Sequence, residues 1–178
     1  IDSFEQDFSS KNKDTLGEVH TDFKLIINML NLIPVKYYKN PKLKWLDPCC
    51  GRGYFVMILY KKLFEHLTMI ENEEKRHNHI IENMIYMIEI NSEHMSNLTK
   101  LFGEKANIIN KSYFDYKETF DIIIGNTPFN IQGNIKVPTN TKLSKKKDGK
   151  TIWQSFIKYS IGKLHQNGLL VFITPSIW

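Results

Sequence analysis

Short apolar runs alternate with longer amphipathic segments over most of this 178-residue chain. The runs have the length of β-strands and cover residues 43–46, 85–88, 107–109, 121–124 and 169–173. Because they are nearly continuous in apolar residues, they predict strands buried on both faces, as in a parallel sheet covered by helices. This alternation is the feature that most limits the folds open to the chain.

The segments between the runs repeat apolar residues at the spacing of an α-helix. The predicted helices cover about residues 22–32, 54–67, the stretch after Ser92, and 152–164, with a more polar helix over 72–83. Thr21 stands where its hydroxyl would cap the first helix. Strands that alternate with helices predict an α/β, doubly wound, mainly parallel sheet.

The composition excludes two broad classes of protein. With 42% hydrophobic and 12% aromatic residues, the chain can fill a packed core, which argues against disorder. The longest apolar runs fall far short of the ~20 residues that cross a bilayer, so we expect no membrane span. The only two cysteines, Cys49 and Cys50, are neighbours that bridge only with strain, which favours a reducing, cytoplasmic setting.

A glycine-containing turn follows the first predicted strand. It reads Asp47-Pro48-Cys49-Cys50-Gly51-Arg52-Gly53 and leads into a predicted helix. Glycines there let the backbone turn sharply and approach a ligand near a helix N-terminus. A dinucleotide fingerprint would need a third glycine where Val56 stands, and Asp47 would occupy the place of a pyrophosphate. A cationic or zwitterionic ligand fits better, with a purely structural turn as the alternative.

Two further strand ends carry polar or aromatic groups. Glu89 ends the second run, where a carboxylate can accept the hydroxyls of a ribose. The fourth run leads into Asn126-Thr127-Pro128-Phe129, in which Asn126 and the Thr127 main-chain carbonyl offer acceptors and Phe129 offers a ring for a flat substrate. Because ligands of open α/β sheets bind at the carboxyl ends of strands, these groups favour a nucleoside ligand.

Taken in order, these segments resemble the motifs of S-adenosylmethionine-dependent N6-adenine DNA methyltransferases. The matching segments are Gly17-Glu18-Val19-His20-Thr21, the turn from Asp47 to Phe55, Glu89-Ile90-Asn91, and Asn126-Thr127-Pro128-Phe129. Their order is that of the gamma group found in restriction–modification enzymes. The resemblance covers nearly the whole chain from Thr15 and implies a Rossmann-like methyltransferase sheet, S-adenosylmethionine as cofactor and DNA as partner.

The resemblance also implies a role for each matching residue. Thr21 would contact the methionine carboxylate of the cofactor, Glu89 would hold the ribose, and Ile90 would lie against the adenine. Asn126 and the Thr127 carbonyl would accept hydrogen bonds from the target amino group. The remaining assignments are the methionine pocket at Asp47, Cys49, Gly51 and Gly53, the cofactor adenine near Pro128, and a flipped base stacked on Phe129.

The chain departs from the family pattern at three places. The family usually has Asn-Pro-Pro, and Thr127 keeps the carbonyl but loses the rigid φ of proline. Its third-strand motif usually shows an acid and then an aromatic residue. Ser112 and Tyr113 fall in that place, and we assign them to the cofactor site, whereas Asp115 comes later. Asp22 replaces a usual proline.

Several alternatives remain open at this point. A protein glutamine N5-methyltransferase can use the same Asn-Xaa-Pro-aromatic turn, and structured RNA is another substrate class. A catalytically inactive nucleic-acid-binding subunit is a candidate of a different kind, suggested only by Thr127 and Ser112. The histidines show no coherent ligand spacing, so we expect no metal site.

The family order also sets an expectation for the domain organisation. We expect residues 1–178 to form one methyltransferase catalytic domain whose sheet stops after the fifth strand. The usual closing strands and a target-recognition domain would then lie outside this chain. An outer strand without a neighbour is an unpaired edge, which predicts a shortened chain, a partner chain over that edge, or limited solubility.

Residues 132–151 form a predicted mobile basic loop directly after the Asn126 turn. This loop holds six lysines against one Asp148: Lys136, Lys142, Lys145, Lys146, Lys147 and Lys150. They could contact nucleic-acid phosphates or could simply be solvated.

If they contact phosphates, affinity for the nucleic acid should fall steeply with salt, and replacing the lysines by neutral residues should flatten that slope in a binding titration. An unchanged slope would contradict phosphate contact.

Overall fold

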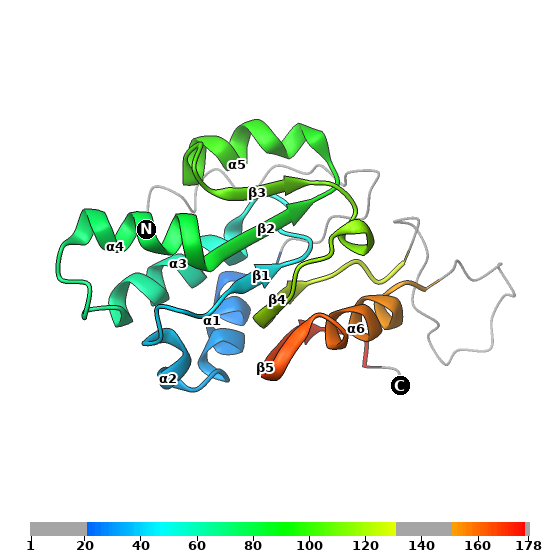
Figure 1. Ribbon diagram of the computed structural model, residues 1–178. Coiled ribbons are helices and arrows are strands. Elements are labelled where there is room, and N and C mark those ends of the chain that lie inside the picture. Colours follow the sequence, from blue (N-terminus) through cyan, green and yellow to red (C-terminus); the bar gives the residue numbers. More distant parts are fainter. Residues whose placement is uncertain (1–20, 131–150, 177–178) are drawn as a thin grey trace, which may run out of the picture.

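The computed structural model describes residues 21–130 and 151–176 and shows one parallel sheet flanked by helices (Figure 1). The strands are β1 (Trp45–Asp47), β2 (Ile85–Glu89), β3 (Asn107–Asn110), β4 (Phe120–Asn126) and β5 (Leu164–Ile173). Every predicted apolar run therefore overlaps a strand, although β1 begins two residues later than predicted, at Trp45. The α/β, doubly wound, parallel architecture expected from the sequence is confirmed.

The helices follow the predicted alternation with a few additions. The α-helices are α1 (Phe23–Asn31), α2 (Val35–Tyr38), α3 (Tyr54–His66), α4 (Glu73–His79), α5 (Met95–Phe102) and α6 (Trp153–Ile161). Short helical turns of other types are η2 (Ile80–Met84), η3 (Ser92–His94) and η4 (Tyr113–Asp115). The short helix α2 was not predicted, and the polar helix predicted over 72–83 is divided into α4 and the π-helical turn η2.

The strand order is β3-β2-β1-β4-β5, so the first strand of the chain, β1, lies at the centre of the sheet. The chain runs outward from β1 through β2 to β3, then returns to the other side of β1 to form β4 and β5. Neighbouring strands β1 and β4 pair in parallel through Trp45 with Ile122 and Leu46 with Ile123. The order reverses between these two strands, and this is the place where open α/β sheets bind ligands.

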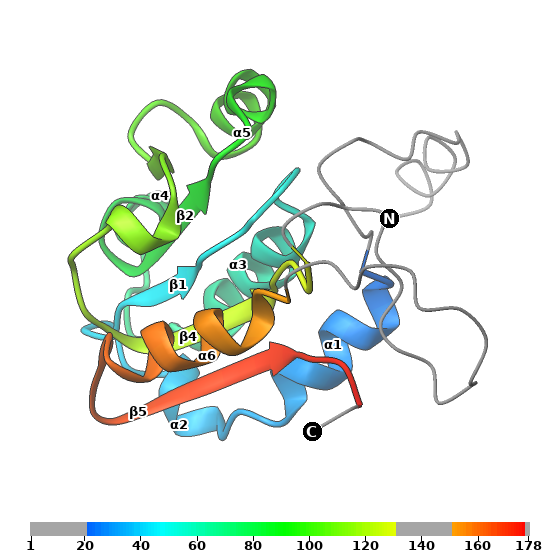
Figure 2. The same cartoon turned by 90° about the vertical axis from the view of Figure 1, so that its right-hand side faces the viewer.

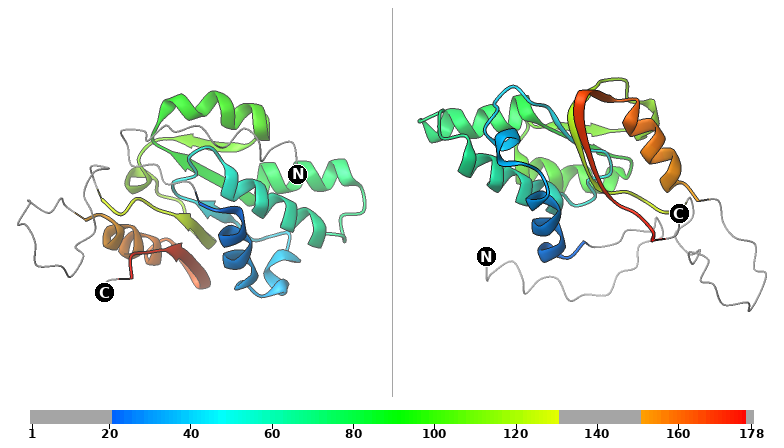
Figure 3. Two further views of the ribbon diagram at one scale, coloured as in Figure 1. Left: turned by 180° about the vertical axis from the view of Figure 1, so that it is seen from behind. Right: turned by 90° about the horizontal axis from the view of Figure 1, so that it is seen from below.

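Helices cover both faces of the sheet, as Figure 1 and the view from below in Figure 3 show. On one face α1, α3 and α5 pack against the strands through apolar residues such as Ile26, Leu59 and Leu98. On the other face α6 contributes Phe156 to a smaller cluster with Phe120 and Ile123. Because helices cover both faces of the sheet, the central strands are buried on both sides, which explains their nearly continuous apolar sequence.

The outer strands are less buried than the sequence led us to expect. Strand β3 is half-buried to exposed, and β5 is exposed over its first residues and half-buried beyond them. Within the described residues β5 pairs only with β4, as Figure 2 shows at the edge of the sheet. The expectation of strands buried on both faces therefore holds for the three central strands, because an outer strand has a neighbour on one side only.

The N-terminal cap of α1 differs from the prediction. Helix α1 begins at Phe23, so Asp22 is its cap residue, and the Asp22 carboxylate accepts a hydrogen bond from the Leu25 N–H at 3.2 Å. The prediction that Thr21 caps this helix is wrong. A carboxylate caps as well as a hydroxyl, and the Thr21 side chain is left for another partner.

The boundary between α6 and β5 also differs from the prediction. The helix ends at Ile161, three residues before the predicted end, and Leu164 already pairs with Phe120 of β4. The register then shifts between Phe120 and Ile122, and Asn167 adopts a φ of 65° at this irregularity. Pairing with β4 therefore outweighs the helical periodicity of this segment.

None of the helices in the described part of the chain is long and apolar enough to cross a membrane.

Gly53 joins the glycine turn to α3 and is required by packing as well as by backbone geometry. Its φ is +85°, and a Cβ there would lie 2.8 Å from Cε2 of Phe102 and 2.9 Å from Cδ2 of Leu98, both on α5. Gly103 has a similar φ of +86° but no atom within 4 Å of such a Cβ.

We expect Gly53→Ala to destabilise the fold more than Gly103→Ala does. Gly53→Ala loses roughly 1–2 kcal/mol to the left-handed backbone, and overpacking adds about 1–3 kcal/mol. Gly103, with φ 86° and ψ 164°, lies in a region that is essentially confined to glycine, so Gly103→Ala loses about 1–3 kcal/mol to the backbone alone. Chemical denaturation of the two variants measures the difference in free energy of unfolding. Equal losses would show that α5 gives way without cost.

Candidate active site

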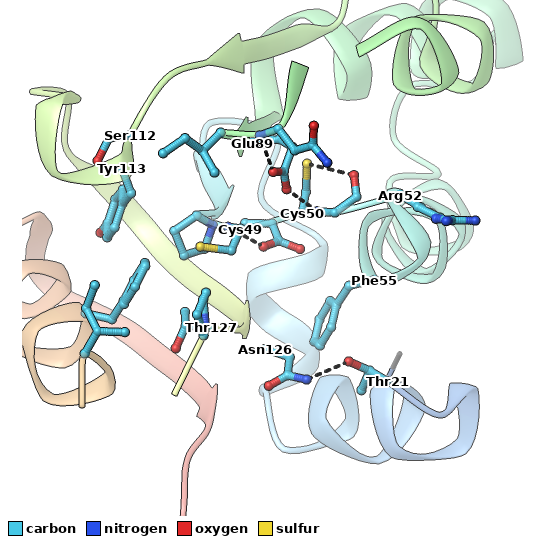
Figure 4. Close-up of a pocket in the computed structure, with 18 of the residues that line it drawn as sticks. Thr21, Cys49, Cys50, Arg52, Phe55, Glu89, Ser112, Tyr113, Asn126 and Thr127 are labelled. Atoms are coloured by element: carbon cyan, nitrogen blue, oxygen red, sulfur yellow. Dashed lines mark hydrogen bonds between the residues drawn. The ribbon is translucent and has the colours of Figure 1, made fainter. Parts of the chain in front are cut away.

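A cavity of about 400 Å³ opens at the carboxyl ends of β1, β2 and β4 (Figure 4). Among its lining residues are all of the predicted catalytic residues and all of the predicted cofactor residues except Gly53. These residues come from positions as far apart in sequence as Thr21 and Phe129, and the fold brings them to one place. Gly53 lies outside the lining, where its role is the packing of α3 against α5.

The glycine turn is fixed to the end of β2 by two hydrogen bonds. The Gly51 N–H donates to Oε2 of Glu89 at 2.8 Å, and the Cys50 N–H donates to the Ile88 carbonyl at 3.0 Å. Gly51 has a φ of 53°, a backbone angle that residues with a side chain rarely adopt. The turn is thus held against the neighbouring strand, and Glu89 is one of its anchors.

Glu89 uses both carboxylate oxygens inside the protein. Besides the bond to Gly51, its Oε1 accepts from the Asn91 N–H at 2.7 Å. Each carboxylate oxygen has a second lone pair, so the group can still accept hydrogen bonds from a ligand in the cavity. The next residue, Ile90, is 65% exposed although it is apolar, and it offers a flat ligand a hydrophobic surface.

Asp47 is only 3% exposed and has an unusual protonation equilibrium. Burial raises its pKa to about 7, a hydrogen bond from the Cys49 N–H opposes this shift, and the nearby Glu89 carboxylate adds to it. A Cβ at Gly125 would lie 2.8 Å from Oδ1 of Asp47, so only glycine leaves room for this carboxylate between β1 and β4. The site therefore contains a buried carboxylate that a cation would stabilise in its ionised form.

The two cysteines are poor candidates for a nucleophile. Burial raises the pKa of the Cys49 thiol and of the Cys50 thiol well above the usual value, and the carboxylates of Asp47 and Glu89 raise both further. A thiol that stays protonated does not attack. Among the described residues no three His, Cys, Asp or Glu side chains are grouped so that they could hold a metal ion.

The turn η4 brings Ser112 and Tyr113 to the cavity wall. Tyr113 is buried, shares a hydrogen bond of 3.0 Å with Ser160 of α6, and stacks on Phe156 with ring centroids 5.8 Å apart. Burial raises the Tyr113 pKa to about 12. On the same helix, the Tyr159 hydroxyl donates to the Phe114 and Tyr116 carbonyls at 2.9 and 2.8 Å. Helix α6 therefore fixes this wall.

The turn after β4 is connected to α1 and α6. The Asn126 Nδ2 donates to Oγ1 of Thr21 at 3.1 Å, a bond that Figure 4 shows across the cavity from the glycine turn. On the other side the Ile152 N–H donates to the Phe129 carbonyl at 2.9 Å, and Asn130 forms an antiparallel bridge with Thr151. Thr127 is 3% exposed, and its hydroxyl has no hydrogen-bond partner among the described residues. The predicted mobile loop, 132–151, lies outside the described residues except for Thr151.

Sequence reasoning missed part of the cavity wall. The additional lining residues are Ile26, Pro48, Cys50, Arg52, Tyr54, Phe55, Asn91, Lys111, Phe114, Asn130, Ile152 and Phe156. Phe55 and Phe156 lie within the predicted helices at 54–67 and 152–164, and helical spacing cannot show that they border a cavity. Arg52 points away from the other labelled side chains in Figure 4.

We expect the buried charge of Asp47 to make stability depend on pH. Its pKa is raised in the folded state, so the unfolded chain binds fewer protons between pH 4 and 7, and wild-type stability should fall as the pH rises through this range. Asp47→Asn removes the charge. Above pH 8 it should be more stable than wild type by on the order of 3 kcal/mol, and this advantage should shrink toward zero below pH 5.

Urea denaturation between pH 5 and 9 measures this difference. Glu104→Gln, a change at an exposed carboxylate, is the matched control and should show little pH-dependent difference from wild type. A stability gain for Asp47→Asn that is the same at pH 5 and pH 9 would contradict the raised pKa.

Comparison with known proteins supports this assignment of the fold. The model of the Eco57I restriction-modification methylase family matches residues 21–178. No curated protein matches the chain. Among solved structures, the fold is similar to the M protein of the type I restriction enzyme EcoKI, with a TM-score of 0.62 and 14% identity over 89% of this chain and 34% of that chain.

Two other solved structures show the same fold. The type I restriction-modification methyltransferase subunit from Streptococcus thermophilus has a TM-score of 0.60 and 14% identity, covering 89% of this chain and 35% of its own. A chain of another type I restriction-modification system has a TM-score of 0.57 and 18% identity, covering 86% and 31%. The chain thus spans about a third of each of these structures. The resemblance found in the sequence is confirmed: the chain belongs to the Eco57I restriction-modification methylase family.

Proposed function

We propose that this chain transfers the methyl group of S-adenosylmethionine to the N6 amino group of adenine in DNA. The observation that carries the proposal is the meeting of two sets of residues in one cavity. Buried carboxylates, Asp47 and Glu89, line one part of it, and the amide and aromatic ring of Asn126 and Phe129 line another. Membership of a restriction-modification methylase family supports the same reaction.

The residues of the cavity fit S-adenosylmethionine. A volume of about 400 Å³ lies within the range of about 300–1,000 Å³ that is usual for cofactor pockets. A cationic sulfonium and ammonium would stabilise the ionised form of Asp47, whose charge is otherwise costly to bury. The remaining lone pairs of Glu89 can accept ribose hydroxyls, and Ile90 can pack against the adenine. When bound, the cofactor supplies an activated methyl group.

The chain's own contribution to the transfer is alignment and polarisation. An exocyclic adenine amine is a poor nucleophile because its lone pair is delocalised into the ring. Two acceptors, Oδ1 of Asn126 and the main-chain carbonyl of Thr127, would bind its hydrogens and favour a pyramidal nitrogen. This is catalysis by orientation and electrostatic stabilisation and requires no covalent bond to the protein.

The target adenine would have to leave the DNA helix to reach the cavity. Flipping a base out of a duplex costs a few kcal/mol, and stacking on an aromatic ring returns about 1–3 kcal/mol. Phe129 follows the catalytic turn and lines the cavity, so it is placed to provide that ring. The choice of DNA sequence would come from a recognition domain outside this catalytic domain.

Three rival functions use the same site. A protein glutamine N5-methyltransferase and an RNA adenine methyltransferase differ in substrate, and an inactive nucleic-acid-binding subunit differs in lacking turnover. The cofactor cavity and Asn126 are shared by all three. The identity of the methylated product separates the two enzymes, and the absence of any product marks the inactive subunit. The family match favours DNA.

The experiment is to incubate the chain with methyl-labelled cofactor and, separately, with DNA, RNA and a cell extract. We expect label in DNA, recovered as N6-methyladenine by mass spectrometry. Asn126→Ala should abolish transfer, by a factor of at least about 100, while retaining cofactor binding in calorimetry. The reason is that it removes an acceptor for the target amine and leaves the carboxylate side of the cavity intact.

Asn83→Ala is the matched control, because Asn83 is exposed on η2 and does not line the cavity. It should transfer methyl groups at the wild-type rate. Label found only in protein or only in RNA would overturn the proposal in favour of the corresponding rival. Cofactor binding without transfer to any of the three substrates would favour the inactive subunit.

A further inference from the structure

Thr21 and Asn126 are 105 residues apart and meet across one hydrogen bond of 3.1 Å. The amide nitrogen of Asn126 is the donor and the Thr21 hydroxyl oxygen is the acceptor. Figure 4 shows the amide nitrogen facing Thr21 and the amide oxygen on the opposite side of the group. Both residues line the cavity.

The direction of the Asn126 amide decides whether the site can work. An asparagine side chain has an acceptor at one end and a donor at the other, and the two are nearly equal in size. With the nitrogen on Thr21, the oxygen is available to a target amine. A rotation of about 180° would present the NH₂ group instead, and two donors cannot form a hydrogen bond.

The Thr21 hydroxyl alone does not select this direction. A hydroxyl both donates and accepts, so it could equally give its proton to the amide oxygen of a rotated Asn126. Phe55, which also lines the cavity, has no hydrogen-bonding atom in its ring. The direction depends on where the Thr21 proton goes.

We propose that Thr21 is a positioning residue through which the carboxylate of the bound cofactor orients the Asn126 amide. This inference rests on the proposed function and on the family resemblance, which implies that the methionine carboxylate of the cofactor contacts Thr21. A carboxylate is an acceptor only, so it would accept a hydrogen bond from the Thr21 hydroxyl. The Thr21 oxygen can then only accept, which fixes Nδ2 of Asn126 toward it and Oδ1 toward the target amine. The bound cofactor would therefore hold the Asn126 amide in the orientation that the structure shows and would disfavour the rotated one.

Two substitutions separate this role from simple cofactor binding. Thr21→Val keeps the shape but removes the hydroxyl, and Thr21→Ser keeps the hydroxyl. We expect Thr21→Val to lower kcat about tenfold at saturating cofactor, the effect of one lost hydrogen bond, and Thr21→Ser to restore it. If Thr21 only helps to bind the cofactor, Thr21→Val should raise KM and leave kcat unchanged, which would overturn the inference.

A second measurement does not depend on activity. The side-chain NH₂ signals of Asn126 in ¹⁵N-labelled protein can be assigned by their loss in Asn126→Asp. S-adenosylhomocysteine, which retains the carboxylate, should slow the solvent exchange of these protons in wild type and in Thr21→Ser. Its decarboxylated analogue should not do so in wild type, and neither compound should do so in Thr21→Val. Equal responses to both compounds in wild type would overturn the inference.

The two proposals fail in different ways. Absence of methyl transfer to DNA by the wild type would contradict the proposed function, while the NMR response would still test the coupling of Thr21 and Asn126. DNA methylation by Thr21→Val at the wild-type kcat would contradict the coupling and leave the proposed function standing. Failure of S-adenosylhomocysteine to bind the wild type would overturn both.

Discussion

The parallel pairing of β1 with β2 on one side and with β4 on the other is the constraint on which the cavity depends. Because the three strands point the same way, their carboxyl ends lie at one edge of the sheet. Asp47, Glu89 and Asn126 each end one of these strands and so become neighbours. The Gly51 N–H bond to Glu89 then ties the glycine turn to β2 and closes that side of the site.

The fold accepts unfavourable electrostatics at this edge. Asp47 is buried beside a second carboxylate, and its pKa rises to about 7 because its charge has lost contact with water. Gly125 makes that burial sterically feasible, since any side chain there would meet the carboxylate. Such a group weakens the empty protein at neutral pH, and a cationic ligand would reverse that effect. Asp47 therefore lowers the stability of the ligand-free protein and at the same time favours the proposed binding of a cationic ligand.

Contacts from distant parts of the chain position the opposite side of the cavity. Thr21 precedes α1 and bonds the Asn126 side chain, while Ile152 precedes α6 and bonds the Phe129 carbonyl. Tyr159 and Ser160 of α6 also hold the turn η4, which lines the same cavity. The two ends of the cavity thus share α6 as a common support.

The sequence by itself determined the strands and their parallel arrangement. All of the site residues predicted from it except Gly53 line the cavity. Continuous apolar runs and polar strand ends are local signals, so they can be read without knowing what packs against them. Only the tertiary structure decided which residue caps α1, where α6 yields to β5, and that Gly53 serves helix packing outside the cavity. It also decided the partner of Thr21. The cap of α1 is a local bond between Asp22 and the Leu25 N–H. The other features depend on contacts between segments far apart in the chain, namely α5 against the Gly53 turn, Phe120 against Leu164, and Asn126 against Thr21. Periodicity within one segment carries no information about such contacts.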